Sequence, residues 1–276
     1  AGQKNNSYKT NMPASMLTNL KERKYNWSYQ SVPEKNLNNR ILQHDRGKVI
    51  GGSSSINGMV YIRGHAEDFN GWDNQGCNGW GYEDVLPYFI KMESYTGGDS
   101  EFRGYNGPLK IRRPKPNDPI TLAFLDAGKE MGYPVTNDVN GFCQEGFGVF
   151  DSTIHKGNRF SSADAYLTPA QQRKNLTIIT ECHVKKIKFE GNTAIGVQFS
   201  DKKNNNIEAH SLKEVILSAG AIGSPQLLML SGIGPGNHLN QLNITTIFDS
   251  PGVGSNLNDH PDFVLKYKCK KPVSLW

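Results

Sequence analysis

Apolar side chains recur at helical spacing in several segments of the chain. Between residues 82 and 95, for example, Val85 and Phe89 fall four positions apart, with an apolar neighbour beside each. This spacing gathers apolar residues on one face of a helix. The pattern predicts helices over residues 68–72, 82–95 and 120–131, and a shorter one near residues 14–23.

Between residues 175 and 219 the pattern changes to short apolar runs that are separated by polar turns. Residues 190–193, Glu-Gly-Asn-Thr, have the composition of a hairpin turn. The last run, at residues 215–217, is continuous, as in a strand that is buried on both faces. We therefore predict a β-meander that leads into a buried strand. The predicted strands cover residues 109–112, 177–181, 184–189, 194–199, 207–211 and 215–218.

A string rich in glycine and serine follows the first polar region, at residues 46–58. Val49 and Ile50 run into Gly51, Gly52 and three serines. Adjacent glycines let another group approach the backbone closely. Serines can also cap a helix start, where free N–H groups and the helix dipole favour an anion. The alternative is a strand-to-helix turn that binds nothing.

A second string of small residues lies at residues 214–235. After the run at residues 215–217 come Ser218, Ala219, Gly220 and Ala221, against which a flat ligand could lie. We predict a short helix with Ser224 as its N-cap and Pro225 in its first turn. Gly232 is placed to end this helix, and Pro235 to prevent its continuation. Open α/β sheets bind nucleotides at such strand-to-helix turns. Close packing of strand and helix, with nothing bound, is the alternative.

The composition argues against several classes of function. The net charge is +5, but the lysines are spread along the chain, which argues against a nucleic-acid-binding surface. No segment approaches the run of about 18 apolar residues that a membrane span needs. The four cysteines lie far apart and have no metal-ligand spacing, so no metal site is expected. Asn-x-Ser/Thr sequons support secretion only faintly, and the compartment stays open.

Together the two strings resemble the two signatures of the glucose–methanol–choline (GMC) family of flavin-dependent oxidoreductases. Residues 47–57, with Tyr61 and Gly64, are similar to the first signature, and residues 220–234 to the second. They occur in the family's order and at a plausible separation. Residues 157–167 and 253–260 also resemble family motifs.

The resemblance implies an α/β fold with α+β elements. The chain would be part of a doubly wound FAD-binding domain with a β-meander excursion. Residues 1–258 would form the FAD-binding region, incomplete at its N-terminus, and residues 259–276 the start of a substrate-binding domain. The family's Gly-x-Gly-x-x-Gly unit and its C-terminal catalytic histidine are not in the sequence. We therefore expect an internal fragment of a protein roughly twice as long.

The resemblance also implies cofactor contacts. Gly51, Gly52 and Ser53 would lie beside the flavin pyrophosphate, within a segment that begins at Val49. Some members carry, in this part of the signature, a histidine that bonds covalently to the flavin. This chain has Asn57 there, which implies FAD that is held non-covalently, with the amide bonded to the ring or the ribityl chain. A helix-cap amide is the alternative for Asn57.

Five further residues complete the implied FAD site. Gly58 would belong to the cofactor site, and Val60 would contact the flavin ring through its backbone. Val184 would pair with adenine through its backbone, unless it is an ordinary strand valine. Ala219 and Gly220 would lie along the adenosine and its phosphate.

The implied activity is oxidation of a CH–OH group, as in alcohol or glucose dehydrogenases. A histidine takes the hydroxyl proton and hydride passes to flavin N5. No catalytic residue is assigned in this chain, because that histidine belongs to the C-terminal segment. His260 is interpreted as structural. The substrate would be an alcohol or a sugar, and the electron acceptor is undetermined. A non-redox lyase that contains FAD, and an inactive binding protein, are the alternatives.

Overall fold

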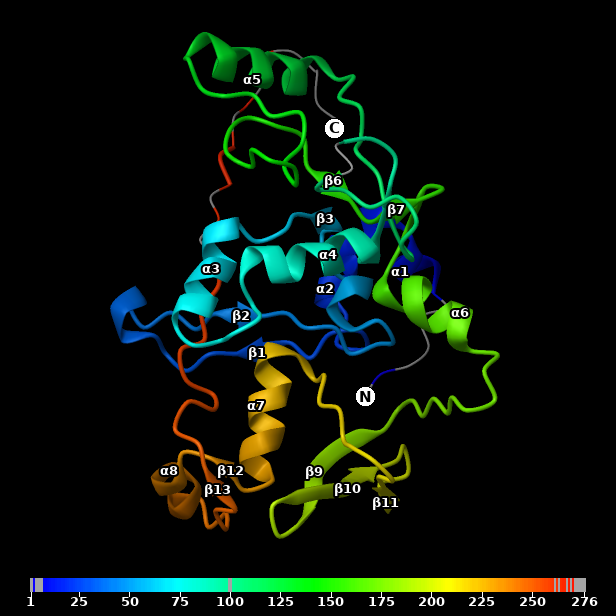
Figure 1. The fold of residues 1–276 in the computed structure, drawn as a ribbon, viewed down its shortest axis with the longest axis vertical. Coiled ribbons are helices and arrows are strands. Elements are labelled where there is room, and N and C mark those ends of the chain that lie inside the picture. Colours follow the sequence, from blue (N-terminus) through cyan, green and yellow to red (C-terminus); the bar gives the residue numbers. More distant parts are fainter. Residues whose placement is uncertain are drawn as a thin grey trace. The chain divides into compact units, whose positions relative to one another are not determined.

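The computed structural model describes residue 2 and residues 7–98, 101–260, 262, 264–266, 268 and 270. The chain forms two compact units (Figure 1). The larger unit comprises Gln3–Ile178 and Lys268–Trp276, and the smaller unit comprises Ala1–Gly2 and Ile179–Tyr267. The first signature lies in the larger unit and the second in the smaller.

The helices of the larger unit confirm most of the predicted ones. Side chains cap the starts of two of them, α3 and α5. His65 accepts the N–H of Glu67 at the start of α3, and Asp118 accepts that of Thr121 at the start of α5. The helices are α1 (Tyr8–Asn11), α2 (Met16–Lys21), α3 (Ala66–Asn74), α4 (Tyr82–Met92), α5 (Pro119–Glu130) and α6 (Thr168–Ala170). Single turns of other helix types cover Pro13–Ser15, Lys35–Leu37, Gly52–Ser55 and Ala163–Leu167.

Helix α4 ends earlier than the pattern predicts. It stops at Met92, and Glu93–Tyr95 form strand β4, which pairs in parallel with β5 (Leu109–Ile111). The carboxylate of Glu93 is fully buried against Arg103, 2.8 Å away. This buried ion pair holds Glu93 in an extended segment, where the spacing of apolar residues had predicted a fourth helical turn.

The remaining strands of the larger unit are two-residue pairs. The ladder of β3 with β6 connects segments that are distant in sequence, whereas β7 and β8 form a tight hairpin. The packed core beneath them includes one cluster of Tyr25, Val49 and Ile56, and another of Tyr61, Tyr95 and Ile111. The pairs are β1 (Tyr29–Gln30) with β2 (Gln43–His44), β3 (Val60–Tyr61) with β6 (Asp151–Ser152), and β7 (Ile154–His155) with β8 (Asn158–Arg159).

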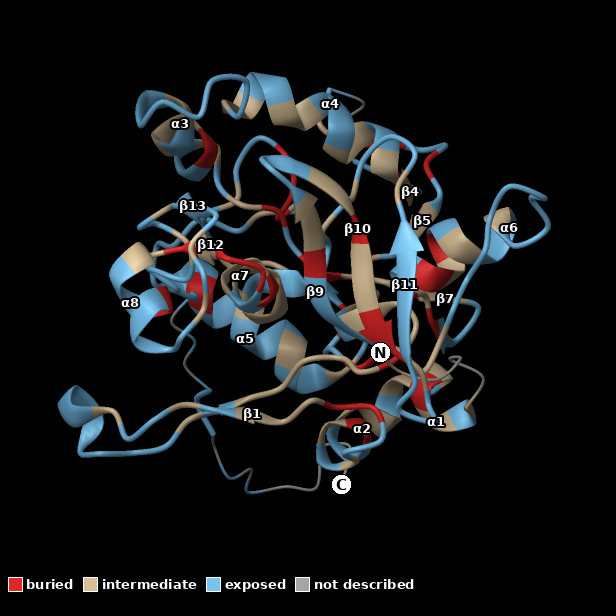
Figure 2. Ribbon diagram, turned by 90° about the horizontal axis from the view of Figure 1, so that it is seen from below, coloured by how far each residue is buried: buried red, intermediate tan, exposed pale blue. Residues whose placement is uncertain are grey.

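The smaller unit contains the predicted meander. Strands β9 (His183–Glu190), β10 (Thr193–Ser200) and β11 (Asn206–His210) form an antiparallel sheet in the order β11-β10-β9. Figure 2 shows β11 exposed along its whole length, whereas β9 and β10 carry buried positions. Helix α7 (Gly220–Leu230) packs on β9. Strand β12 (Ile233–Gly234), helix α8 (Gly236–Gln241) and strand β13 (Phe248–Asp249) follow.

Two predicted strands are wrong. Residues 177–181 form no strand: no described strand pairs with them, and Glu181 adopts a left-handed conformation (φ 56°) and donates its N–H to the carbonyl of Gly2. Residues 215–218 belong to no strand, and Ile216 is 79% exposed. A strand buried on both faces needs neighbours in a sheet. No described strand pairs with this segment.

Candidate cofactor site

The turn of the first signature is short and tightly closed. Gly51 (φ 88°) precedes a single 3₁₀ turn, Gly52–Ser55, whose N–H at Gly52 bonds to the carbonyl of Val49. The prediction that the serines cap a helix is therefore wrong. Their hydroxyls bond to nearby carbonyls instead. Ser54 donates to Gly51 (2.6 Å), and Ser55 donates to Ile50 (2.8 Å).

The two glycines of this turn face different surroundings. A Cβ at Gly51 would lie 2.4 Å from the hydroxyl of Ser55, which is fully buried. A Cβ at Gly52 (φ 56°) would meet no atom within 4 Å. Ser53 beside it is exposed and accepts the N–H of Gly47. Open backbone at Gly52 fits the approach of a cofactor phosphate, as the resemblance implies.

Asn57, Gly58 and Val60 follow on the exposed side of the same segment. Met59 between them is buried and adopts a left-handed conformation (φ 62°), which is strained for a residue with a side chain. Val60, the first residue of β3, is 52% exposed, whereas Tyr61 is buried. Asn57 caps no helix start, since its side-chain oxygen accepts the N–H of Met59 and a bond from Arg159.

The motif at residues 157–167 packs directly against this turn. Arg159 lies at the end of β8 and donates to the carbonyl of Ser54 and to the side chain of Asn57. Ser162 donates its N–H to the hydroxyl of Ser54 and its own hydroxyl to the carbonyl of Gly51. Two stretches about a hundred residues apart thus build one site in the larger unit.

In the smaller unit, Val184 lies on β9 and Gly220 begins α7, and these two elements are in contact. β9 is an edge strand of its sheet, and Val184 is 40% exposed. Helix α7 begins at Gly220, with Ala219 as N-cap, so the prediction that Ser224 caps it is wrong. Ser224 instead lies inside the helix, and its hydroxyl accepts the N–H of Ala219 (3.1 Å).

Gly220 resembles Gly52 in its surroundings. Its φ is 84°, and a Cβ there would meet no atom within 4 Å. Each unit therefore offers one open, left-handed glycine at a signature turn. Both positions fit a cofactor that lies against the backbone. Of the predicted contacts, Val49, Gly51, Gly52, Ser53, Asn57, Gly58 and Val60 lie in the larger unit, and Val184, Ala219 and Gly220 in the smaller.

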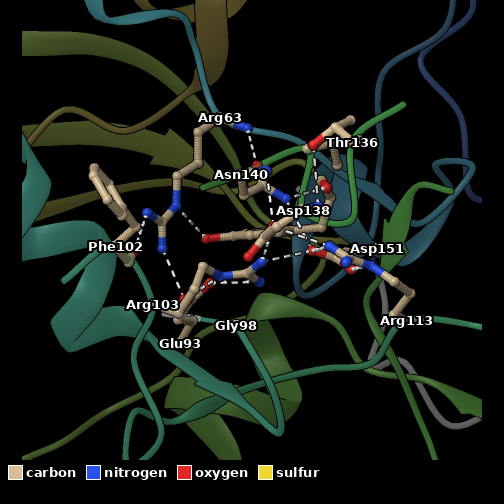
Figure 3. Close-up of polar contacts among 12 residues, drawn as sticks. Arg63, Glu93, Gly98, Phe102, Arg103, Arg113, Thr136, Asp138, Asn140 and Asp151 are labelled. Atoms are coloured by element: carbon tan, nitrogen blue, oxygen red, sulfur yellow. Dashed lines mark hydrogen bonds and ion pairs between the residues drawn. The ribbon is translucent and has the colours of Figure 1, made fainter. Parts of the chain in front are cut away.

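A buried cluster of charges behind β3 was not predicted from the sequence (Figure 3). Arg103 lies at its centre and bonds to three carboxylates, at 2.8 Å from Glu93, 2.6 Å from Asp138 and 3.0 Å from Asp151. Its guanidinium also stacks on the ring of Tyr95, 3.8 Å from the centroid. The cluster consists of Arg63, Arg103, Arg113, Glu93, Asp138 and Asp151.

Three arginines face three carboxylates in this cluster, so its formal charges balance. Burial alone would lower the pKa of Arg103, but the hydrogen bond and charge of Glu93, with the charges of Asp138 and Asp151, raise it overall. Removing one partner from such a set leaves an uncompensated buried charge, which costs about 3–5 kcal/mol.

Asn140 connects the charge cluster to the strand that carries Val60. Its amide donates to the carbonyl of Tyr61 (3.1 Å) and to Asp151 (3.0 Å), and its oxygen accepts the N–H of Arg63 (2.8 Å). Through these bonds the cluster fixes the backbone of β3 from behind. Burial also raises the pKa of the Tyr61 phenol, on the same strand, to about 12.

The other candidates contribute no further chemistry. His260 is exposed, and its backbone N–H bonds to Asp259. Within the described residues, no group of three or more His, Cys, Asp or Glu side chains could hold a metal. None of the helices in the described ranges is long and apolar enough to cross a membrane.

Comparison with known proteins identifies curated relatives. The chain is 49% identical over 275 residues to human mitochondrial choline dehydrogenase, matching 100% of this chain and 46% of that protein. It is 50% identical over 266 residues to the oxygen-dependent choline dehydrogenase of Rhizobium etli, matching 96% and 48%. The chain thus spans about half the length of these relatives.

Solved structures share the fold. Pyridoxine 4-oxidase from Mesorbium loti superposes with a TM-score of 0.85 at 35% identity, over 91% of this chain and 49% of that one. An FAD-dependent oxidoreductase from Chaetomium thermophilum gives 0.84 at 32% identity, over 91% and 46%. These likenesses confirm the fold class and FAD as the cofactor of this fold. The sequence model of the GMC oxidoreductase family matches residues 11–262, and the chain belongs to that family.

Proposed function

We propose that this chain is the FAD-binding part of an oxidoreductase that oxidises the CH–OH group of an alcohol. The observation that carries the proposal is the open turn at Gly52, followed by exposed Asn57 and Val60, in a chain of the GMC family. FAD, when bound, would supply the acceptor for the hydride that leaves the substrate carbon.

The residues of this chain would bind and orient the cofactor. The backbone at Gly52 and Ser53 would approach the pyrophosphate, and Asn57 would hydrogen-bond the ring or the ribityl chain. Val60 would line the flavin ring. In the smaller unit, Val184, Ala219 and Gly220 would contact the adenosine part. No residue of this chain is assigned as the acid or base.

Choline is the substrate we propose to test first. The relatives matched over nearly the whole of this chain are named as choline dehydrogenases, at 49% and 50% identity. The wider family gives only the reaction class, because one fold hosts many substrates.

The test uses the full-length protein, expressed from the complete reading frame and purified with its flavin. Choline, added without oxygen, should bleach the visible absorbance of the flavin. Tetramethylammonium, a similar cation that lacks the CH–OH group, should leave it unchanged. Stoichiometric flavin that no alcohol bleaches would support the non-redox lyase instead. A full-length protein that binds no flavin would support the inactive binding protein.

A further inference from the structure

Arg159 is a buried cation that no carboxylate in the described part of the chain neutralises. Its side chain bonds only to neutral oxygens: its Nε donates to the carbonyl of Thr10 (2.9 Å), and its Nη1 to that of Ser54 (3.1 Å) and to the side chain of Asn57 (2.8 Å). The residue is 3% exposed, and its Nη2 is buried with no partner among the described residues. Burial accordingly lowers the pKa of Arg159.

This arginine contrasts with those of the charge cluster. Arg63 and Arg103 are equally buried, but each lies 2.8 Å from the carboxylate of Glu93. Burying a cation without a charged partner costs free energy. Because the burial of Arg159 at the signature turn costs stability, its presence there indicates a role other than stabilising the fold.

The bond from Arg159 fixes how the amide of Asn57 is turned. Its side-chain oxygen receives Arg159 Nη1 at 2.8 Å and the backbone N–H of Met59 at 3.1 Å. Both of these groups are donors only, so the amide cannot flip without breaking both bonds. The amide nitrogen of Asn57 must then face away from Arg159. Asn57 is exposed, and no described residue accepts a bond from this nitrogen.

We propose that Arg159 is a positioning residue for the cofactor. It holds Asn57 so that the amide presents only N–H donors to the bound FAD. Asn57 therefore contacts an acceptor of the cofactor, such as a ring carbonyl, a ring nitrogen or a ribityl oxygen, and never a donor. The inference rests on the proposed function, because it takes FAD as the ligand.

A first test replaces the donor of Asn57 and keeps its acceptor. In the full-length protein, Asn57→Asp still accepts from Arg159 and from Met59, and it gives the buried guanidinium a charged partner. The apoprotein should be at least as stable as wild type, whereas its affinity for FAD should fall about tenfold or more. Asn158→Asp adds the same charge at an exposed neighbour of Arg159 and should change neither quantity. Wild-type FAD affinity in Asn57→Asp overturns the inference.

A second test asks whether Arg159 acts through Asn57. FAD affinity and thermal stability are measured for Arg159→Met, Asn57→Ala and the double variant, all full-length. Arg159→Met should weaken FAD binding in the wild-type background but add little once Asn57 is alanine. Its loss of stability should persist in both backgrounds, because the bonds to Thr10 and Ser54 do not involve Asn57. Additive effects on FAD affinity overturn the inference.

The two proposals fail in different ways. A wild-type full-length protein that binds no FAD contradicts the proposed function. A protein that binds FAD, but whose affinity and visible flavin spectrum are the same in Asn57→Asp, contradicts only the positioning role. Should Arg159→Met not fold, Asn57→Asp and Asn158→Asp decide the question, because both alter exposed side chains.

Discussion

The two adjacent glycines of the first signature have different physical reasons to be glycine. Both have positive φ, which costs a residue with a Cβ about 1–2 kcal/mol. Only Gly51 is also enclosed, since Ser55, whose hydroxyl a Cβ there would meet, is fully buried and bonded to the carbonyl of Ile50. Gly51 is therefore required by packing, whereas the space for a Cβ at Gly52 is open on the side where the proposed cofactor would approach.

This difference predicts that alanine at the two positions separates stability from cofactor binding. In the full-length protein, Gly52→Ala should lower the free energy of unfolding by about 1–2 kcal/mol and should strongly weaken FAD binding. Gly51→Ala should lose more stability, by about 1–3 kcal/mol beyond that strain, because the added methyl overpacks the site. Urea unfolding of the apoproteins and FAD titration measure the two effects. Equal FAD affinity in Gly52→Ala and wild type would contradict the prediction.

Tyr61 supports a pH-dependence prediction at the same scale. Burial raises its pKa from the ordinary value of about 10 to about 12, although Arg63 opposes the shift. A raised pKa means that the neutral phenol is favoured by folding, so its contribution is complete below about pH 10 and is lost as the pH rises through about 12. The stability difference between wild type and Tyr61→Phe should change over this alkaline range and stay flat below it. If the difference in unfolding free energy between wild type and Tyr61→Phe stayed constant up to about pH 12, the raised pKa of Tyr61 would be refuted.

The sequence allowed part of the site to be predicted at the residue scale. Gly52, Asn57, Val60 and Gly220 could be named as candidates because the residues of each signature are close together in sequence. Arg159 lay in a recognised motif, but no role could be assigned to it without its contact to Asn57, which is 102 positions away. The charge cluster was missed because its members also lie far apart in sequence. Arg103 and Asp151, for example, are 48 positions apart. Local patterns do not record such pairings.

At the scale of elements, local periodicity predicted the helices and the hairpin well. It predicted poorly those segments whose structure depends on partners distant in sequence. The turn between β9 and β10 follows from its own composition. Glu93 leaves the helical pattern because its carboxylate pairs with Arg103. Residues 215–218 have the composition of a buried strand, but whether they pair depends on neighbours in a sheet, which composition does not record.

A buried hydroxyl links the C-terminal end of α7 to β9. Ser231, the C-cap of α7, accepts the N–H of Ile187 (2.8 Å) and donates to the carbonyl of Leu227 (2.6 Å), and it is fully buried. Ser231→Ala should leave the N–H of Ile187 unsatisfied and lower the free energy of unfolding by about 1–3 kcal/mol. Ser255→Ala, which removes an exposed hydroxyl, is the matched control. Hydrogen exchange should be faster at Ile187 in the first variant, and unchanged exchange there would contradict the role of Ser231.

At the scale of the whole molecule, the proposed cofactor contacts are divided between two compact units. The turn at Gly52 belongs to one, and the start of α7 at Gly220 to the other. The segment before α7 also exposes apolar side chains, with Leu212 fully exposed and Ile216 79% exposed. Exposed apolar residues on a segment outside any sheet favour self-association.

We therefore predict that a chain limited to these 276 residues binds FAD weakly, oxidises no alcohol and self-associates. The proposed adenosine contacts and flavin contacts lie in different units, so neither unit alone encloses the cofactor, and the exposed side chains of Leu212 and Ile216 are free to pack against a second copy. Flavin content after purification and light scattering measure the two effects, with the full-length protein as reference. Ile216→Lys should reduce self-association of the short chain without restoring FAD binding, since it removes apolar surface but supplies no cofactor contact. A short chain that is purified as a monomer with stoichiometric flavin would contradict the prediction, and would show that these two units suffice to hold FAD.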